Sequence, residues 1–513
     1  MATTETREER LARLKQSLVR DKQKADAPEA APAPAQAETP PVAPVRRSRL
    51  LDAIARLLGA PPSDAPQGPA VVATPQDPPI FTVLVTALAG DADGTAAAYL
   101  FHALQGRAGL AVKPLPKAFL LDSMEDPAQV AAIMLNTRHA VVEETADLLV
   151  WGDKGKDGYR LRLATATQAG DDTLGSFGPT TRVELPFDFA EAPGNLLYAA
   201  ILAAAEPTSE AQRAGVRKLL PAAATAVEAL AAKPPVQMSM PQQRAVQQVF
   251  GHIAAATALV AAQPEQAKAW FGKAVESYRS AQRRLRPTDA GWEAGLIHKH
   301  LAAVLTVQAE RTKEAAPLLE EAVKEWRSAA ETLTRAMMPQ EWAGAQVRLG
   351  VALYRLDLIT GQTELLREAL QVLQGTLQVY TRTETPARWA EVMHTVAQVL
   401  EVYGDQMKSA EVLTRAADTC RSVCEVRTRE RTPLAWAATQ NTLGSALFLL
   451  DRHGGGAAHL IEAEQVLAAA LGIFQNHGAK GPAKVAARNL AHVRKLMEAR
   501  RNRQIVDPHW MDG

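Results

Sequence analysis

The chain has 513 residues, of which 47% are hydrophobic and 22% are charged, and this composition excludes fibrous and largely disordered chains. The 57 Lys and Arg residues balance the 56 Asp and Glu residues, so the net charge of +1 excludes a general electrostatic attraction to nucleic acid or membranes. Only Cys420 and Cys424 occur, which excludes a disulfide framework and fits a reducing compartment.

The beginning of the chain carries no sign of export or membrane insertion. Its first residues, MATTETREERLARLKQ, contain no apolar core of signal-peptide length. The longest nearly uncharged stretches, such as residues 195–205, are shorter than the about 20 residues that cross a bilayer. These features predict a cytoplasmic protein without a membrane span.

Residues 1–79 are predicted to be a disordered, Pro/Ala-rich tail. The stretch ADAPEAAPAPAQAETPPVAPV has too little apolar surface to offset the entropy of ordering. Within the tail, residues 46–58 predict a short amphipathic helix, in which arginines surround one apolar stripe. The stripe consists of Leu50, Leu51, Ile54, Leu57 and Leu58. Three roles stay open for this helix: packing on the protein's own surface, docking into a partner's groove, or lying on a membrane.

Residues 80–190 predict a small α/β domain with the element order β-α-β-α-β-β. The continuous apolar runs at 80–88 and 147–152 indicate buried strands, whereas the alternation at 159–165 indicates a half-exposed strand. The other elements are helices near 94–105 and 127–144, the segment LAVKPLP between them, and a further strand at 182–187. The end of the 147–152 strand, followed by RLRL, resembles the α/β amino-terminal domain of TolB-type proteins.

Residues 195–235 predict a helical connector that breaks near Pro207 and Pro221, and residues 240–503 predict helical repeats with a capping helix at the end. The motif Pro-x-x-Trp-Ala begins at Pro339, Pro386 and Pro433, so it recurs every 47 residues. A large apolar residue followed by a small one recurs with nearly the same period, at 250–251, 301–302, 349–350, 396–397, 443–444 and 490–491. Such self-similarity indicates an array of units, each too small to bury its own apolar face.

These repeats resemble the tetratricopeptide repeat (TPR) family, in a bacterial type with extended repeats of about 47 residues. The Leu-Gly pairs at 349–350 and 443–444 match the family's first helix, and Ala267, Phe271 and Ala274 match its second. The resemblance implies a mainly α fold, with an α-solenoid of five hairpins and a capping helix after the small α/β domain. The prolines are expected to set the first helical turn. Tryptophans are expected to anchor the extra turn against the previous repeat, at Trp292, Trp342, Trp389 and Trp436.

No motif predicts catalysis, and neither a cofactor nor a metal is expected. The glycine-rich stretch 87–99 lies where phosphate-binding loops lie, but no lysine follows its glycines, so we interpret it as a turn with an acidic helix cap. Cys420 and Cys424 lack two further ligands at a fixed spacing, which favours packing over zinc binding. The basic helix at 484–503 lacks an aromatic platform, so nucleic acid is not expected as a partner.

The resemblance implies a non-catalytic scaffold or adaptor that binds a protein or peptide in the concave groove of the repeats, and self-association stays open. The alternative is a signalling or sensor protein whose α/β domain binds a small ligand or nucleotide. In the family, groove residues lie three before, one after and four after the small residue of each first helix. A merely solvated inner face is the other interpretation of these positions. They correspond here to Gln248, His252, Lys299, Val347, Tyr354, His394, Gln398, Glu401, Asn441, Ser445, Phe448, Arg488, His492 and Lys495.

Overall fold

The structure is a computed structural model that describes residues 78–166, 174–187, 191–313, 315–455 and 458–506. The predicted disordered tail, including the amphipathic helix at 46–58, lies outside the described residues. The described residues form two compact units. The first unit comprises residues 78–166 and 175–270, and the second comprises residues 271–506 together with Leu174.

The first unit contains a five-stranded sheet with the strand order β2-β1-β3-β4-β5. The strands are β1 (Phe81–Ala87), β2 (Leu110–Ala118), β3 (Leu148–Lys154), β4 (Tyr159–Thr165) and β5 (Val183–Leu185). β1 pairs in parallel with both β2 and β3, whereas β4 is antiparallel to β3 and to β5. The small α/β domain expected from the sequence is confirmed. β1 and β3 are almost entirely buried, as strands of parallel pairs covered on both faces should be.

The helices of the first unit are α3 (Thr95–Leu104), α4 (Pro127–Glu143), α5 (Glu191–Ala204), α6 (Glu210–Ala232) and α7 (Met240–Val260). The predicted break at Pro207 lies between α5 and α6, but the predicted break at Pro221 is wrong, because α6 continues through it. Leu220, Ala224 and Val227 are buried on either side of this proline. Their packing therefore offsets the backbone hydrogen bond that a proline removes from a helix.

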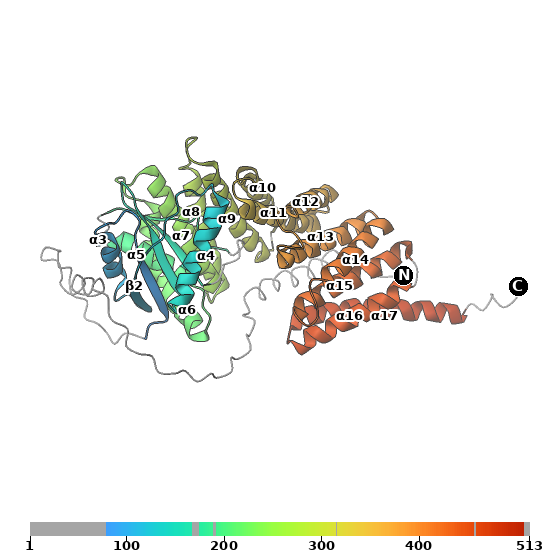
Figure 1. The fold of residues 1–513 in the computed structure, drawn as a ribbon. Coiled ribbons are helices and arrows are strands. Elements are labelled where there is room, and N and C mark those ends of the chain that lie inside the picture. Colours follow the sequence, from blue (N-terminus) through green and yellow to red (C-terminus); the bar gives the residue numbers. More distant parts are fainter. Residues whose placement is uncertain (1–77, 167–173, 188–190, 314, 456–457, 507–513) are drawn as a thin grey trace, which may run out of the picture. The chain divides into compact units, whose positions relative to one another are not determined.

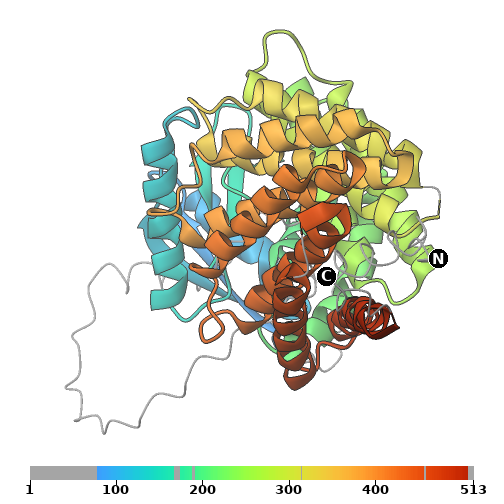
Figure 2. The same ribbon diagram turned by 90° about the vertical axis from the view of Figure 1, so that its right-hand side faces the viewer.

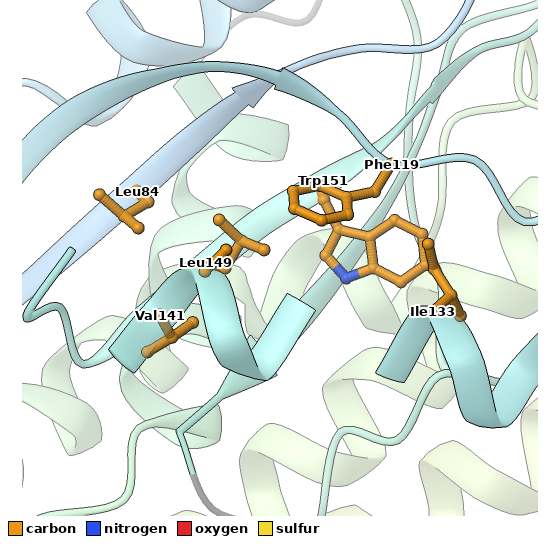
Figure 3. Packing of buried hydrophobic residues seen from close by; sticks show 7 residues of the cluster. Leu84, Phe119, Ile133, Val141, Leu149 and Trp151 are labelled. Carbon is orange, nitrogen blue, oxygen red and sulfur yellow. The ribbon is translucent and has the colours of Figure 1, made fainter. Parts of the chain in front are cut away.

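One apolar cluster joins α4 to the face of the sheet beneath it (Figure 3). Leu84 of β1 and Leu149 and Trp151 of β3 contribute from the sheet, and Ile133 and Val141 contribute from α4. Phe119, which follows β2, packs edge-on against Trp151 with ring centroids 6.4 Å apart. This cluster fixes which side of α4 faces the sheet.

The second unit is an array of helical hairpins, as the repeats predicted. Its helices alternate along the chain, and we call the helix that opens each repeat its first helix and the one that follows its second helix. The first helices are α9 (Gly291–Glu310), α11 (Pro339–Thr360), α13 (Pro386–Gln406), α15 (Pro433–Leu450) and α17 (Lys480–Val506). The second helices are α10 (Ala315–Thr332), α12 (Thr363–Thr376), α14 (Ala410–Cys424) and α16 (Ala458–Asn476). A short π-helix, η1 (Asp451–Gly455), follows α15, and α8 (Pro264–Gln282) crosses the boundary between the two units.

α9, α11, α13 and α15 each pack against the second helix that follows, and neighbouring first helices, up to α15 with α17, also contact each other. The hairpins follow one another in chain order, from yellow through orange to red (Figures 1 and 2). Pro339, Pro386 and Pro433 occupy the first turns of α11, α13 and α15, so the predicted role of these prolines is confirmed.

The tryptophans are less buried than the sequence suggested. Trp292 is buried, but Trp342, Trp389 and Trp436 are half-buried. Trp436 packs with side chains of α16 and α17, which lie in its own hairpin and in the following helix. These tryptophans therefore contribute less burial than a fully enclosed aromatic ring would.

The recurring small residue allows close packing within a hairpin. A Cβ atom at Gly350 would lie 2.6 Å from Cγ of Leu373, and one at Gly444 would lie 2.5 Å from Cγ of Leu467. Both distances are too short for real contacts, so glycine is required opposite leucine. One repeat earlier than Gly444, alanine occurs instead, and the position equivalent to Leu467 is occupied by the smaller Cys420.

We therefore expect Gly444→Ala to destabilise the array by about 1–3 kcal/mol, as overpacking does. Leu467→Cys should cost a similar amount through lost burial, but the two changes together should cost about 1–2 kcal/mol less than their sum. Urea unfolding followed by circular dichroism would measure this coupling. The control is Gly272→Ala on α8, where no atom lies within 4 Å of the added Cβ and no destabilisation is expected. Additive costs would contradict the proposed steric pairing.

Candidate interaction face of the first helices

The structure distributes the predicted groove residues over buried, half-buried and exposed positions. Seven are buried: His252, Lys299, Val347, Tyr354, His394, Glu401 and Ser445. Five are half-buried: Gln248, Gln398, Asn441, Phe448 and Arg488. The two that are exposed, His492 and Lys495, both lie on α17. The buried side chains offer a partner little surface while the helices keep this arrangement.

Several of the buried residues form a polar seam between consecutive first helices. Lys299 on α9 makes an ion pair with Glu341 on α11. Ser445 on α15 donates a 2.6 Å hydrogen bond to Glu401 on α13. These contacts hold one repeat to the next, so Lys299 and Glu401, three before and four after the small residues of their helices, and Ser445, one after its own, serve the array itself. Their role in partner binding stays a prediction.

His394 of α13 joins the seam to the segment that follows α14. Arg427, which follows α14, approaches Nδ1 of His394 at 3.0 Å, and Nε2 lies 3.1 Å from Oγ1 of Thr442 on α15. Because arginine can only donate, Nδ1 accepts and Nε2 carries the ring proton. Burial, and secondarily the charge of Arg427, lowers the pKa of His394 to about 3, so the ring is neutral near pH 7.

A second set of contacts joins the carboxyl ends of the first helices. We call it the acid ladder: each acid accepts a hydrogen bond from a donor one repeat later. The pairs are Glu310 with Arg355, Asp357 with Gln406, Asp405 with His453, and Asp451 with Arg500. Asp451 is buried, and both of its oxygens accept from Arg500, at 2.6 and 2.7 Å. Asp451 and His453, both in η1, thus contribute to two steps of the ladder.

The open side of the first helices lies on neighbouring positions. On α11, three half-buried side chains lie two residues before, one after and five after the small residue. On α13, three lie six before, two before and one after it. Each set of three forms one helical stripe. We call the two stripes together the open row: Arg348, Val351, Arg355, Glu391, Thr395 and Gln398. Of the predicted groove residues on these two helices, Gln398 alone belongs to it. Complementary pairs spaced 42 to 48 residues apart, such as Lys299 with Glu341, are the sequence signal that could have identified the seam residues.

The glycine-rich loop after β1 caps a helix, which agrees with the interpretation made from the sequence. The carboxylate of Asp91, which is buried, accepts hydrogen bonds from the amides of Ala96 and Ala97 at the start of α3, at 3.2 and 3.0 Å. It also lies 3.6 Å from Nζ of Lys154. The loop's own acid thus occupies the helix terminus where a phosphate would bind.

The two cysteines lie within the packing of α14. Cys420 is buried, and burial raises the pKa of its thiol. Burial also raises the pKa of Cys424 to about 11, so both are protonated thiols at neutral pH. Within the described ranges, no group of three or more His, Cys, Asp or Glu residues is placed to hold a metal ion. No helix among the described residues has the length and apolar character needed to span a bilayer.

Comparisons with known proteins give no family. No protein-family model and no curated protein matches the chain. Among solved structures, a Signal Transduction ATPase with Numerous Domains protein with a tetratricopeptide repeat sensor, from Pyrococcus horikoshii, shares 13% identity over 58% of this chain and 42% of its own, with a TM-score of 0.35. A circular tandem repeat protein shares 14% identity over 60% of this chain and 82% of its own, with a TM-score of 0.24. This chain therefore spans less than half of the first of these proteins.

The class of the protein follows from its own elements. Hairpins of paired helices, repeated every 47 residues, follow a small α/β domain. The fold is a tetratricopeptide-like helical repeat array, in which the seam and the open row lie side by side on the first helices.

Proposed function

We propose that the chain is a non-catalytic interaction scaffold that binds a protein or peptide segment along the open row of its first helices. The observation that carries this proposal is the composition of the open row. Arg348, Thr395 and Gln398 are polar and half-buried, and the apolar Val351 belongs to the same row. Half-buried polar groups near an apolar side chain can bind a peptide selectively, through hydrogen bonds and one apolar contact.

The rigidity of the row supports the same proposal. The seam and the acid ladder join successive first helices through polar contacts, which fix the spacing of the open row from repeat to repeat. A preorganised surface binds with a smaller entropic cost than one that must be ordered first. Repeat arrays use surfaces of this extended kind for binding.

The test separates the open row from the rest of the array. A partner is first identified by co-purification with the full chain and mass spectrometry, and its affinity is then measured by calorimetry. Arg348→Ala combined with Gln398→Ala should weaken binding by about 10-fold or more, because each lost contact contributes on the order of 1 kcal/mol. The matched control is Arg415→Ala combined with Gln371→Ala, which removes the same residue types from exposed positions on α14 and α12.

Both double variants should retain the circular dichroism signal and melting temperature of the parent chain. An equal loss of affinity in the two would indicate that the open row is not the binding surface. Unchanged affinity in the first variant would contradict the proposal directly.

A further inference from the structure

Helix α4 of the first unit has apolar side chains on two opposite faces. Its inner face, with Ile133 and Val141, packs in the cluster on the sheet (Figure 3). Its outer face carries Leu135 and Val142, which are 52% and 59% exposed and lie seven residues apart on one stripe. Packing on the sheet thus accounts for the inner face of α4 and leaves the apolar groups of its outer face uncovered.

This outer face is the main gathering of exposed apolar groups in the described residues. We define the outer α4 surface as Leu120, Ala131, Ala132, Leu135 and Val142, all of which are exposed. Leu120 directly follows Phe119, which belongs to the same buried cluster as Ile133 of α4. The other exposed large apolar side chains lie on other elements: Tyr99, Val236, Met240, Met407 and Ile461. Exposed apolar groups gathered on one element in this way are typical of an interaction site.

We propose that residues 46–58 of this same chain dock on the outer α4 surface as an amphipathic helix. In that segment Leu51, Ile54 and Leu58 have the spacing i, i+3, i+7, so they form a stripe about 10 Å long. The same seven-residue spacing separates Leu135 from Val142. A helix over 46–58 would be about 20 Å long, which fits along the about 25 Å of α4. The alanines of the surface allow a close approach of the two helices.

The charges of the two elements are complementary. The segment carries four arginines and one acid within residues 46–58. Acids frame the outer α4 surface at both ends of the helix, and they are exposed: Asp122, Glu125, Asp126, Glu143 and Glu144. The cationic groups of the same region are Lys117 and the half-buried Arg138, with His139 on the exposed side of α4. Acids outnumber cations around the outer α4 surface, so the arginines of the segment are attracted to these acids.

The connection between the two elements makes the chain itself the favoured occupant. The linker of residues 59–80 can span up to about 70 Å, which is more than twice the about 25 Å length of α4. One short helix face buries far less than the about 1,200 Å² of a stable interface between separate molecules. A tether raises the local concentration to the millimolar range, so this small surface suffices within one chain.

The experiment measures how well the segment shields α4 in the full chain. In a Cys424→Ser background, Val142→Cys introduces a thiol on the outer surface, and its rate of modification by a maleimide is recorded. The reference is Val236→Cys, at a position that is 84% exposed in the same unit. If the segment docks, the thiol at position 142 should react about 10-fold more slowly than the reference, because reaction requires undocking.

Variants of the segment then identify what shields the thiol. Ile54→Asp with Leu58→Asp should restore the rate to within about twofold of the reference, since charge on the stripe prevents docking. Ala53→Asp with Ala55→Asp adds the same charge outside the stripe and should leave the protection in place. The proposal is overturned if the thiol reacts at the reference rate in the parent chain, or if the stripe variant stays protected. Protection that rises with protein concentration would assign the surface to a second copy. A segment that binds phosphatidylserine vesicles while position 142 stays unprotected would assign the stripe to a membrane.

Discussion

Gly152→Ala should destabilise the first unit by about 4 kcal/mol or more, the range reached when overpacking and backbone strain act together. Gly152 lies in β3 with a φ of +151°, which side chains other than glycine rarely adopt. A Cβ at this position would overlap the carbonyl oxygen of Arg160 on β4. Because the obstructing atom belongs to the backbone of the paired strand, no side-chain rotation can relieve the overlap.

The expected consequence is a local loss of the β3–β4 pairing. The carbonyl of Gly152 also accepts a hydrogen bond from the amide of Ala89, at 3.0 Å, so the same residue ties the loop after β1 to β3. Hydrogen exchange measured by mass spectrometry should show faster exchange in β3 and β4, and urea unfolding should give the loss in stability. The control is Gly178→Ala in the same unit, where the nearest atom to the added Cβ is Oγ1 of Thr180 at 3.7 Å. Similar exchange in both variants would show that the sheet tolerates the overlap.

The sequence predicted the elements of this fold well because their signals are local. The first turns of three first helices follow from Pro339, Pro386 and Pro433, since proline at the start of a helix needs no neighbour to be recognised. The buried strands likewise follow from continuous apolar runs. Pro221 shows the limit: packing on both sides of it carries α6 through a residue that usually breaks a helix.

The binding surface was harder to predict because it depends on how helices sit beside one another. Periodicity places Gln398 and His394 on neighbouring stripes of α13, only about one turn apart. It does not reveal which stripe faces the next first helix. In the structure His394 lies in the seam and Gln398 in the open row. A small rotation of each helix about its axis decides whether a given residue lies on the open row or in a contact between helices.

Glu341→Ala is expected to cost about 3–5 kcal/mol, as does removal of one partner from a buried ion pair. The side chains of Lys299 and Glu341 are only 6% and 15% exposed. Removing the carboxylate leaves the ammonium charge in the seam without the group that offsets its desolvation. The free energy of unfolding of the array, obtained from urea titrations, measures the loss.

An exposed pair of the same kind provides the comparison. Arg327 on α10 and Glu368 on α12 also join successive repeats, at 2.7 Å, but their side chains are 44% and 33% exposed. Glu368→Ala should therefore cost less than about 1 kcal/mol, because solvent screens the pair. Equal costs for the two substitutions would mean that water reaches the Lys299–Glu341 pair and screens its charges.

Replacing both members of the seam pair distinguishes stability from the positioning of repeats. Lys299→Met with Glu341→Leu removes both charges and fills the space with apolar groups, so stability should return to within about 1 kcal/mol of the parent chain or exceed it. The apolar pair, however, lacks the directional contact that fixes one first helix against the next. If the ion pair serves to hold the open row in register, the double variant should bind the partner more weakly although it is no less stable. Unchanged affinity would leave the pair with a purely structural role, and the spacing of the open row would then rest on the acid ladder and on the packing of the hairpins.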